Sequence, residues 1–145
     1  MGAIFNDELK RLRGHFMEMG IDASEQIYQA TKAFTEHDPA LANQVLTTDN
    51  KINDEEVSLE KEALKLMALQ QPVASDFRKI ISILKASSDI ERLGDYATHI
   101  ARAAINLSDR EHNEQIEGQI EKMMLIVREM LERVLDAYAQ TNEQA

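Results

Sequence analysis

The chain has 145 residues, a net charge of −10 and no cysteine. Its length suits one domain with a moderate core, and the absence of cysteine excludes disulfides, thiolate metal sites and cysteine nucleophiles and fits a reducing cytoplasm. The acidic balance disfavours nucleic acid as a partner, because phosphate backbones are held mainly by lysine and arginine.

Helical periodicity runs through the first half of the chain, with apolar residues at steps of three and four. It predicts a first helix over residues 5–36 and a second over residues 39–69. Asp38 and Pro39 separate them, and we expect Asp38 to cap the second helix with Pro39 in its first turn. Pro72 then breaks the second helix.

The second half of the chain predicts a third helix over residues 74–107 and a fourth over residues 114–141. Helices of about thirty residues span roughly 45 Å at about 1.5 Å per residue. Long helices joined by tight turns predict an all-α fold. We expect an antiparallel three-helix bundle over residues 1–107, a polar linker over 108–113 and a fourth helix within 114–145. The longest apolar run, residues 123–127, is far too short to cross a membrane.

Glu91 and Asp95 lie four positions apart on one face of the third predicted helix, and His99 continues that face. Carboxylate and imidazole groups in one line suit Mg, Mn, Fe or Zn. Spacing alone favours a solvated acidic face, because the same spacing recurs elsewhere without special context. The recurrences are Glu56/Glu60, Glu117/Glu121 and Glu132/Asp136.

A second pair of oxygen ligands, Asp49 and Asn53, lies on the second predicted helix. Asn53 and Glu91 are equally far from Pro72 along the chain, so antiparallel packing about this turn would bring the two pairs together. The sequence therefore predicts a cation site between two helices, formed by Glu91, Asp95, Asp49 and Asn53. His99 is a further candidate ligand.

Four other residues have structural or interaction roles in this interpretation. Gly94 costs a helix about 1 kcal/mol relative to alanine, which fits close approach of a ligand or, at least equally, of another helix. Asp76 in a first turn interacts favourably with the helix dipole. Arg78 is available to pair with Asp76 or with a neighbouring helix, and Arg92 is either a counter-charge for Glu91 or a surface residue.

The remaining histidines, His15, His37 and His112, fall singly and predict no joint site. Phosphate-binding loops, nucleophile elbows and HExxH zinc motifs do not occur in the sequence. A ferritin-like di-metal enzyme would need Glu-x-x-His pairs, and the chain has none. We therefore expect a protein that is not an enzyme.

Three segments resemble the PhoU family of regulators of bacterial phosphate uptake. They are DELKRLRGHFMEMG (7–20), TTDNKIND (47–54) and ALQQPVASDFRKIISILKASSDIERLGDYATHIA (68–101). The resemblance implies a fold of tandem three-helix repeats, each with an acidic E/D-x-x-x-D motif that can bind metal, including iron or zinc. On this chain the motif residues are Glu91 and Asp95, with Asp49 and Asn53 in the matching motif of the second helix.

The resemblance also implies partners: the phosphate-specific ABC transporter and a membrane sensor histidine kinase. Family members restrain phosphate uptake and the starvation response, and are cytoplasmic proteins at the periphery of the membrane. His99 departs from the family, which commonly has asparagine there. The alternatives are a purely structural helical bundle without metal and, less favoured, a metal-dependent helical enzyme.

The sequence ends after a segment that resembles the first helix of a second repeat. We expect either a fragment or a short member of the family that is completed by self-association. The apolar stripe of the fourth helix then covers its own bundle or exchanges into a second chain, which predicts a homodimer.

Overall fold

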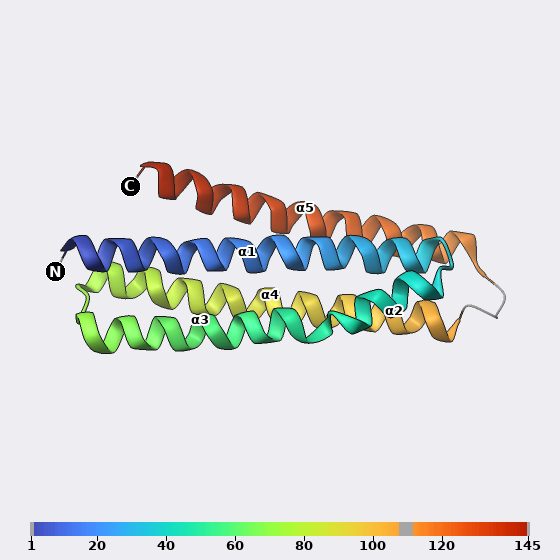
Figure 1. Ribbon diagram of the computed structural model, residues 1–145. Coiled ribbons are helices and arrows are strands. Elements are labelled where there is room, and N and C mark those ends of the chain that lie inside the picture. Colours follow the sequence, from blue (N-terminus) through green and yellow to red (C-terminus); the bar gives the residue numbers. More distant parts are fainter. Residues whose placement is uncertain (1, 108–111, 145) are drawn as a thin grey trace.

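The computed structural model describes residues 2–107 and 112–144, which form five α-helices and no strand (Figure 1). The helices are α1 (Gly2–Thr35), α2 (Pro39–Thr47), α3 (Asp49–Gln70), α4 (Ala74–Asn106) and α5 (Glu114–Gln144). They run lengthwise and form an elongated bundle (Figure 1). The predicted all-α bundle is confirmed.

Helix α1 occupies the centre of this bundle and packs against each of the other four helices. Its buried residues recur at steps of three and four and include Leu12, Phe16, Met19 and Ile27, which are fully buried. Burying a side chain of this size contributes roughly 1.5–3 kcal/mol. The apolar residues that predicted the first helix therefore form the centre of the hydrophobic core.

The second predicted helix is not continuous, because it breaks at Thr48 into α2 and α3. The hydroxyls of two neighbouring threonines bond to the preceding turn: Thr47 Oγ1 donates to the Gln44 carbonyl (2.7 Å) and Thr48 Oγ1 to the Val45 carbonyl (3.0 Å). Such local bonds compete with the helical ladder. The sequence interpretation of one helix over residues 39–69 missed this break.

The turn between α1 and α2 follows the predicted chemistry. Asp38 Oδ1 accepts a hydrogen bond from the Leu41 amide (3.1 Å), and Pro39 opens α2. The Asp38 amide donates to the Ala33 carbonyl (2.9 Å), a bond typical of a Schellman helix end. His37, which lies between α1 and α2, has φ 54°, a left-handed conformation that glycine usually adopts at this position of a helix end.

Helix α5 packs along α1 within the same chain. Leu131 and Leu135 are buried against the bundle, and the rings of Phe16 and Tyr138 lie 4.9 Å apart. Gly20 of α1 makes room for this contact, since a Cβ there would collide with the Leu135 side chain. Residues 108–111 of the predicted linker lie outside the described residues, and α5 begins at Glu114 as expected.

Candidate functional site

Helices α3 and α4 pack side by side and antiparallel, with a register two to three residues further along α4 than equal distances from Pro72 predict. The Thr98 hydroxyl donates to Asp49 Oδ1 (2.7 Å), which joins the start of α3 to the last third of α4. One turn along, Gly94 faces Ile52, whose Cδ1 would lie 3.2 Å from an added Cβ. The two predicted oxygen pairs therefore lie on facing stretches of neighbouring helices.

Four carboxylates gather along this line, and we call them the acidic cluster: Asp49, Glu56, Glu91 and Asp95. Partial burial, followed by the negative charges of Asp95, Glu56 and Asp49, raises the pKa of Glu91. Burial raises the pKa of Glu56 as well, helped by the charges of Glu60 and Asp95. Both shifts share a physical cause: like charges stand close together on a partly covered surface.

The acidic cluster has the negative charge of a cation site, but its carboxylate oxygens are too far apart to bind one ion together. In residues 2–107 and 112–144, no lysine, arginine or histidine forms an ion pair with Glu56, Glu91 or Asp95. A hard cation such as Mg²⁺ or Mn²⁺ prefers an oxygen-only set of this kind. No three residues of the acidic cluster hold their ligand atoms within 4.8 Å of one another in the described structure. Their side chains would have to rotate to enclose an ion.

The two remaining candidate ligands, Asn53 and His99, lie at the surface. Asn53 lies exposed on α3, and His99 is exposed with its ring edge-on to Tyr96, centroids 6.4 Å apart. Among the described residues Arg92 forms no ion pair with Glu91, and its interaction with Tyr96 raises the pKa of Arg92.

Gly94 is explained by helix packing. An added Cβ would lie 3.2 Å from Ile52 Cδ1 and 3.4 Å from Oε1 of Gln26, so α3 and α1 both approach α4 here. Asp76 lies in the first turn of α4 as expected and pairs with Lys79 at 3.9 Å rather than with Arg78. Arg78 lines a surface hollow together with Arg13 and Lys79.

Sequence reasoning missed two features. Glu56, set aside as a spacing without context, belongs to the acidic cluster, and its place one turn after Asn53 on the same face of α3 was the available signal. His37 and His112, expected to fall singly, meet at Glu117. In an up–down–up bundle the first and third long helices finish at the same end of the molecule. His37, which follows the first, and His112 and Glu117, which follow the third, are therefore brought to the same end by the topology.

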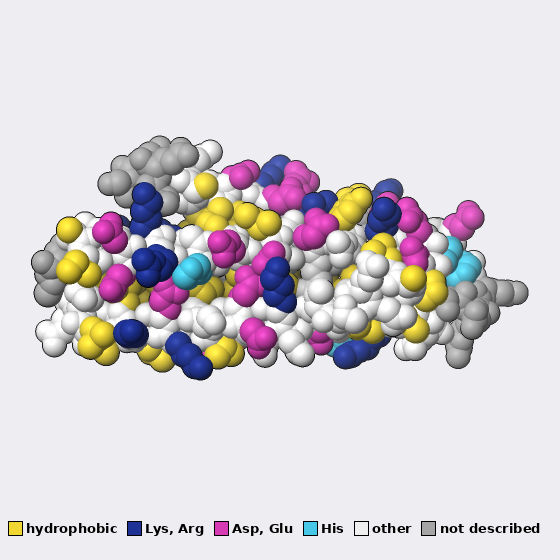
Figure 2. All heavy atoms as spheres, viewed as in Figure 1, with side chains coloured by type: hydrophobic (Ala, Val, Ile, Leu, Met, Phe, Trp, Pro, Cys, Tyr) yellow, Lys and Arg dark blue, Asp and Glu magenta, His cyan; other side chains and the backbone are white. Residues whose placement is uncertain are grey.

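The described surface shows no continuous basic face in the view of Figure 2, where acidic side chains separate the lysines and arginines and apolar patches lie between them. Within residues 2–107 and 112–144, none of the helices combines the length and the apolar character that crossing a bilayer requires.

Comparison with known proteins gives concordant results. Residues 16–104 match the sequence model of the PhoU domain. The chain is 42% identical over 137 residues to a phosphate-specific transport system accessory protein PhoU homolog of Pseudomonas putida, covering 93% of this chain and 53% of that protein. It is 33% identical over 135 residues to the accessory protein PhoU of Escherichia coli, covering 93% and 56%. The chain thus spans about half the length of the curated relatives it matches.

Solved structures agree with these matches. The crystal structure of PhoU from Pseudomonas aeruginosa superposes with a TM-score of 0.89 at 37% identity, over 94% of this chain and 65% of that one. The phosphate transport system regulatory protein PhoU from Streptococcus pneumoniae superposes with a TM-score of 0.83 at 29% identity, over 97% and 69%.

Proposed function

Because the chain belongs to the PhoU family, we propose that it regulates phosphate uptake and phosphate-starvation signalling through protein contacts. The observation that carries the proposal is the match of residues 16–104 to the PhoU domain, together with relatives named as accessory proteins of phosphate-specific transport systems. In this proposal the partners are the phosphate ABC transporter and a sensor histidine kinase, and the effect is negative regulation when phosphate is plentiful.

The proposed mode of action is binding rather than catalysis, at the cytoplasmic side of the membrane. Exposed apolar side chains along α5, which include Met123, Ile126 and Met130, supply surface for contact with a partner or with a second copy of the chain. Their arrangement supports a homodimer as the assembled form.

A reporter experiment tests the regulatory role. In a bacterium that lacks its own PhoU protein, a phosphate-starvation promoter is active even in phosphate-rich medium if PhoU restrains the kinase. Expression of this chain should lower reporter output in rich medium, and pull-down from solubilised membranes should recover the transporter. Unchanged reporter output with stable expression of the chain would contradict the proposal.

We further propose that the acidic cluster binds a hard divalent or iron ion. Its oxygen donors and the raised pKa of Glu91 support this, because a cation would relieve the repulsion among the carboxylates. Zinc fits this oxygen-only set less well than it fits imidazole.

Metal titration by equilibrium dialysis tests the acidic cluster. Mn²⁺ should bind the wild type and lose at least tenfold in affinity in the Glu91→Ala/Asp95→Ala double variant, because two of the facing ligands are gone. Glu129→Ala/Glu132→Ala on α5 is the matched control that removes two carboxylates elsewhere. Equal binding by all three proteins would leave the acidic cluster as a solvated surface of a structural bundle.

A further inference from the structure

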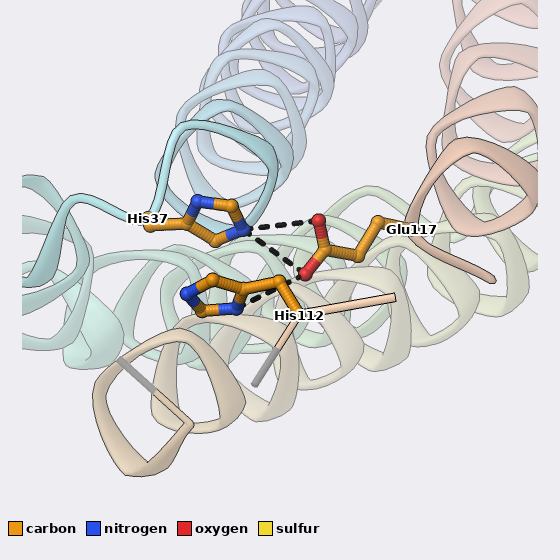
Figure 3. A group of neighbouring side chains, drawn as sticks. All are labelled: His37, His112 and Glu117. Carbon is orange, nitrogen blue, oxygen red and sulfur yellow. Dashed lines mark hydrogen bonds and ion pairs between the residues drawn. The ribbon is translucent and has the colours of Figure 1, made fainter. Parts of the chain in front are cut away.

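Three side chains from separate segments meet at the end of the bundle where α1 and α4 finish (Figures 1 and 3). They are His37 from the α1–α2 turn, His112 just before α5, and Glu117 from the first turn of α5, and we call them the histidine cluster. His37 Nε2 lies 3.0 Å from both carboxylate oxygens of Glu117, and His112 Nδ1 lies 3.4 Å from Oε1. Both rings turn a nitrogen toward the carboxylate (Figure 3).

Backbone hydrogen bonds hold two of these residues in place. His37 occupies the left-handed position between α1 and α2, fixed by the bond from the Asp38 amide to the Ala33 carbonyl. Asn113 caps α5 by accepting bonds from the amides of Gln115 and Ile116, both at 3.1 Å. The Glu117 amide donates to the Asn113 carbonyl (3.0 Å), which sets the carboxylate one turn into the helix.

The histidine cluster is partly enclosed. The side chains of His37, His112 and Glu117 are 34%, 30% and 16% exposed, respectively. Among the residues that the structure describes, it is the one group of three or more histidine, aspartate or glutamate side chains whose ligand atoms all lie within 4.8 Å of one another. Its members come from positions 37, 112 and 117, so helical spacing along one element does not explain their convergence.

The donor set identifies a class of metal. Two imidazole nitrogens and one carboxylate oxygen form a common zinc-binding set, which leaves a fourth position open. Tetrahedral zinc with bonds of about 2.0–2.1 Å places neighbouring ligand atoms about 3.3 Å apart. The separations of 3.0 and 3.4 Å from Glu117 to the two histidines lie on either side of that value.

We propose that the histidine cluster binds a divalent transition ion of the zinc class and so clips the start of α5 to the α1–α2 turn. The rings of His37 and His112 are stacked, with centroids 3.5 Å apart and planes at 15°. Each imidazole donates its lone pair in the plane of the ring, so the rings tilt apart when they share one ion. The site is distinct from the acidic cluster in place and in donor chemistry.

Zinc titration of the full chain without an affinity tag tests the proposal, by calorimetry and by the thermal midpoint Tm. The informative variant is His37→Gly, because glycine adopts the left-handed conformation freely and preserves the turn while it removes one ligand. The wild type should bind one equivalent of Zn²⁺ that raises Tm. His37→Gly and Glu117→Gln should weaken binding by about 100-fold or more, since even loss of an outer partner of a ligand costs about 10–100-fold.

Two variants separate this site from other zinc binding. His15→Ala removes an imidazole that lies 2.7 Å from Glu62, outside the histidine cluster, and Glu91→Ala/Asp95→Ala removes two members of the acidic cluster. Both should keep the equivalent of zinc, and Co²⁺ in its place should give the intense visible absorption of a tetrahedral ion, absent in His37→Gly. Uptake of no zinc by the wild type, or equal affinity in His37→Gly, would reduce the cluster to two histidines hydrogen-bonded to a carboxylate and overturn the proposal.

Discussion

Glu55 of α3 faces Asp22 of α1 at the edge of the core. Burial, followed by the hydrogen bond and the charge of Asp22, raises the pKa of Glu55 to about 7, and Lys51 opposes this shift. Within the part of the chain that the structure describes, its Oε1 is buried without a hydrogen-bond partner. Between about pH 4.5 and 7 the folded chain therefore holds a proton here that the unfolded chain has released.

This proton sets the sign of a pH dependence. The folded state binds more protons than the unfolded state in this window, so the free energy of unfolding falls as pH rises through it. Urea unfolding of the wild type should show higher stability at pH 5 than at pH 7.5. Glu55→Gln should flatten most of this slope, because the amide does not ionise, and Glu56 and Glu91 account for the remainder.

The exposed Glu25 supplies the comparison for Glu55. Glu25→Gln removes an exposed carboxylate of the same bundle, one that accepts a hydrogen bond from Gln29 on its own helix. It should leave the slope between pH 5 and 7.5 as in the wild type. An unchanged slope in Glu55→Gln would mean that other groups carry the proton linkage.

At the scale of elements, one glycine of α1 makes room for a buried leucine of α5. Gly20→Val places a side chain where Leu135 now lies, and overpacking of this kind costs about 1–3 kcal/mol. Since Leu135 belongs to α5, the variant should loosen α5 while α1, α3 and α4 keep their packing. Hydrogen exchange should show faster exchange of α5 amides alone.

Gly14 is the matched control on the same helix, because nothing lies within 4 Å of a Cβ added there. Gly14→Val should leave α5 exchange unchanged. Equal exchange of α5 in the Gly20 and Gly14 variants would show that Leu135 does not anchor the helix.

Helix ends were predictable where a single residue decides them. Asp38 and Pro39 cap and open α2, and Pro72 separates α3 from α4, each through its own backbone chemistry. The break at Thr48 was not predictable from apolar period, because threonine hydroxyls interrupt the helix there without changing the stripe.

The position of the acidic cluster was predictable in part, because Pro72 marks the turn between the two helices that carry it. The equal distances of Asn53 and Glu91 from Pro72 predicted that the two pairs face each other, and the Thr98 hydroxyl of α4 does donate to Asp49 Oδ1 of α3. The orientation of individual side chains was not accessible in this way: Asn53 and His99 are exposed, and the ring of His99 lies edge-on to Tyr96. The histidine cluster required the topology, since its three members share no local pattern.

At the scale of the whole molecule, α5 has a second apolar side that the bundle leaves exposed. Its outer stripe is Met123, Ile126, Met130 and Val134, at steps of three and four, with exposed fractions of 63%, 58%, 61% and 45%. Apolar surface arranged in a helical stripe is typical of a partner contact. The proposed homodimer would use this stripe.

Sedimentation velocity across a range of concentrations tests self-association. The wild type should shift from monomer to dimer as concentration rises, and Met130→Glu should weaken the dimer at least tenfold, because a charge would be buried in the contact. Val57→Glu, at an exposed apolar residue of α3, should have no such effect. A wild type that stays monomeric at the highest concentration would refute the dimer.

The central position of α1 also has a consequence for synthesis on the ribosome. Helix α1 precedes α4, with which it packs most extensively, and the last residues of α4 follow the end of α1 by about seventy residues. At about 5–20 residues per second this interval lasts roughly 4–14 s. During that time the face of α1 that carries Leu12, Phe16, Met19 and Ile27 lacks its packing against the complete α4 and against α5. The nascent chain therefore exposes, for several seconds, apolar surface that the finished bundle buries.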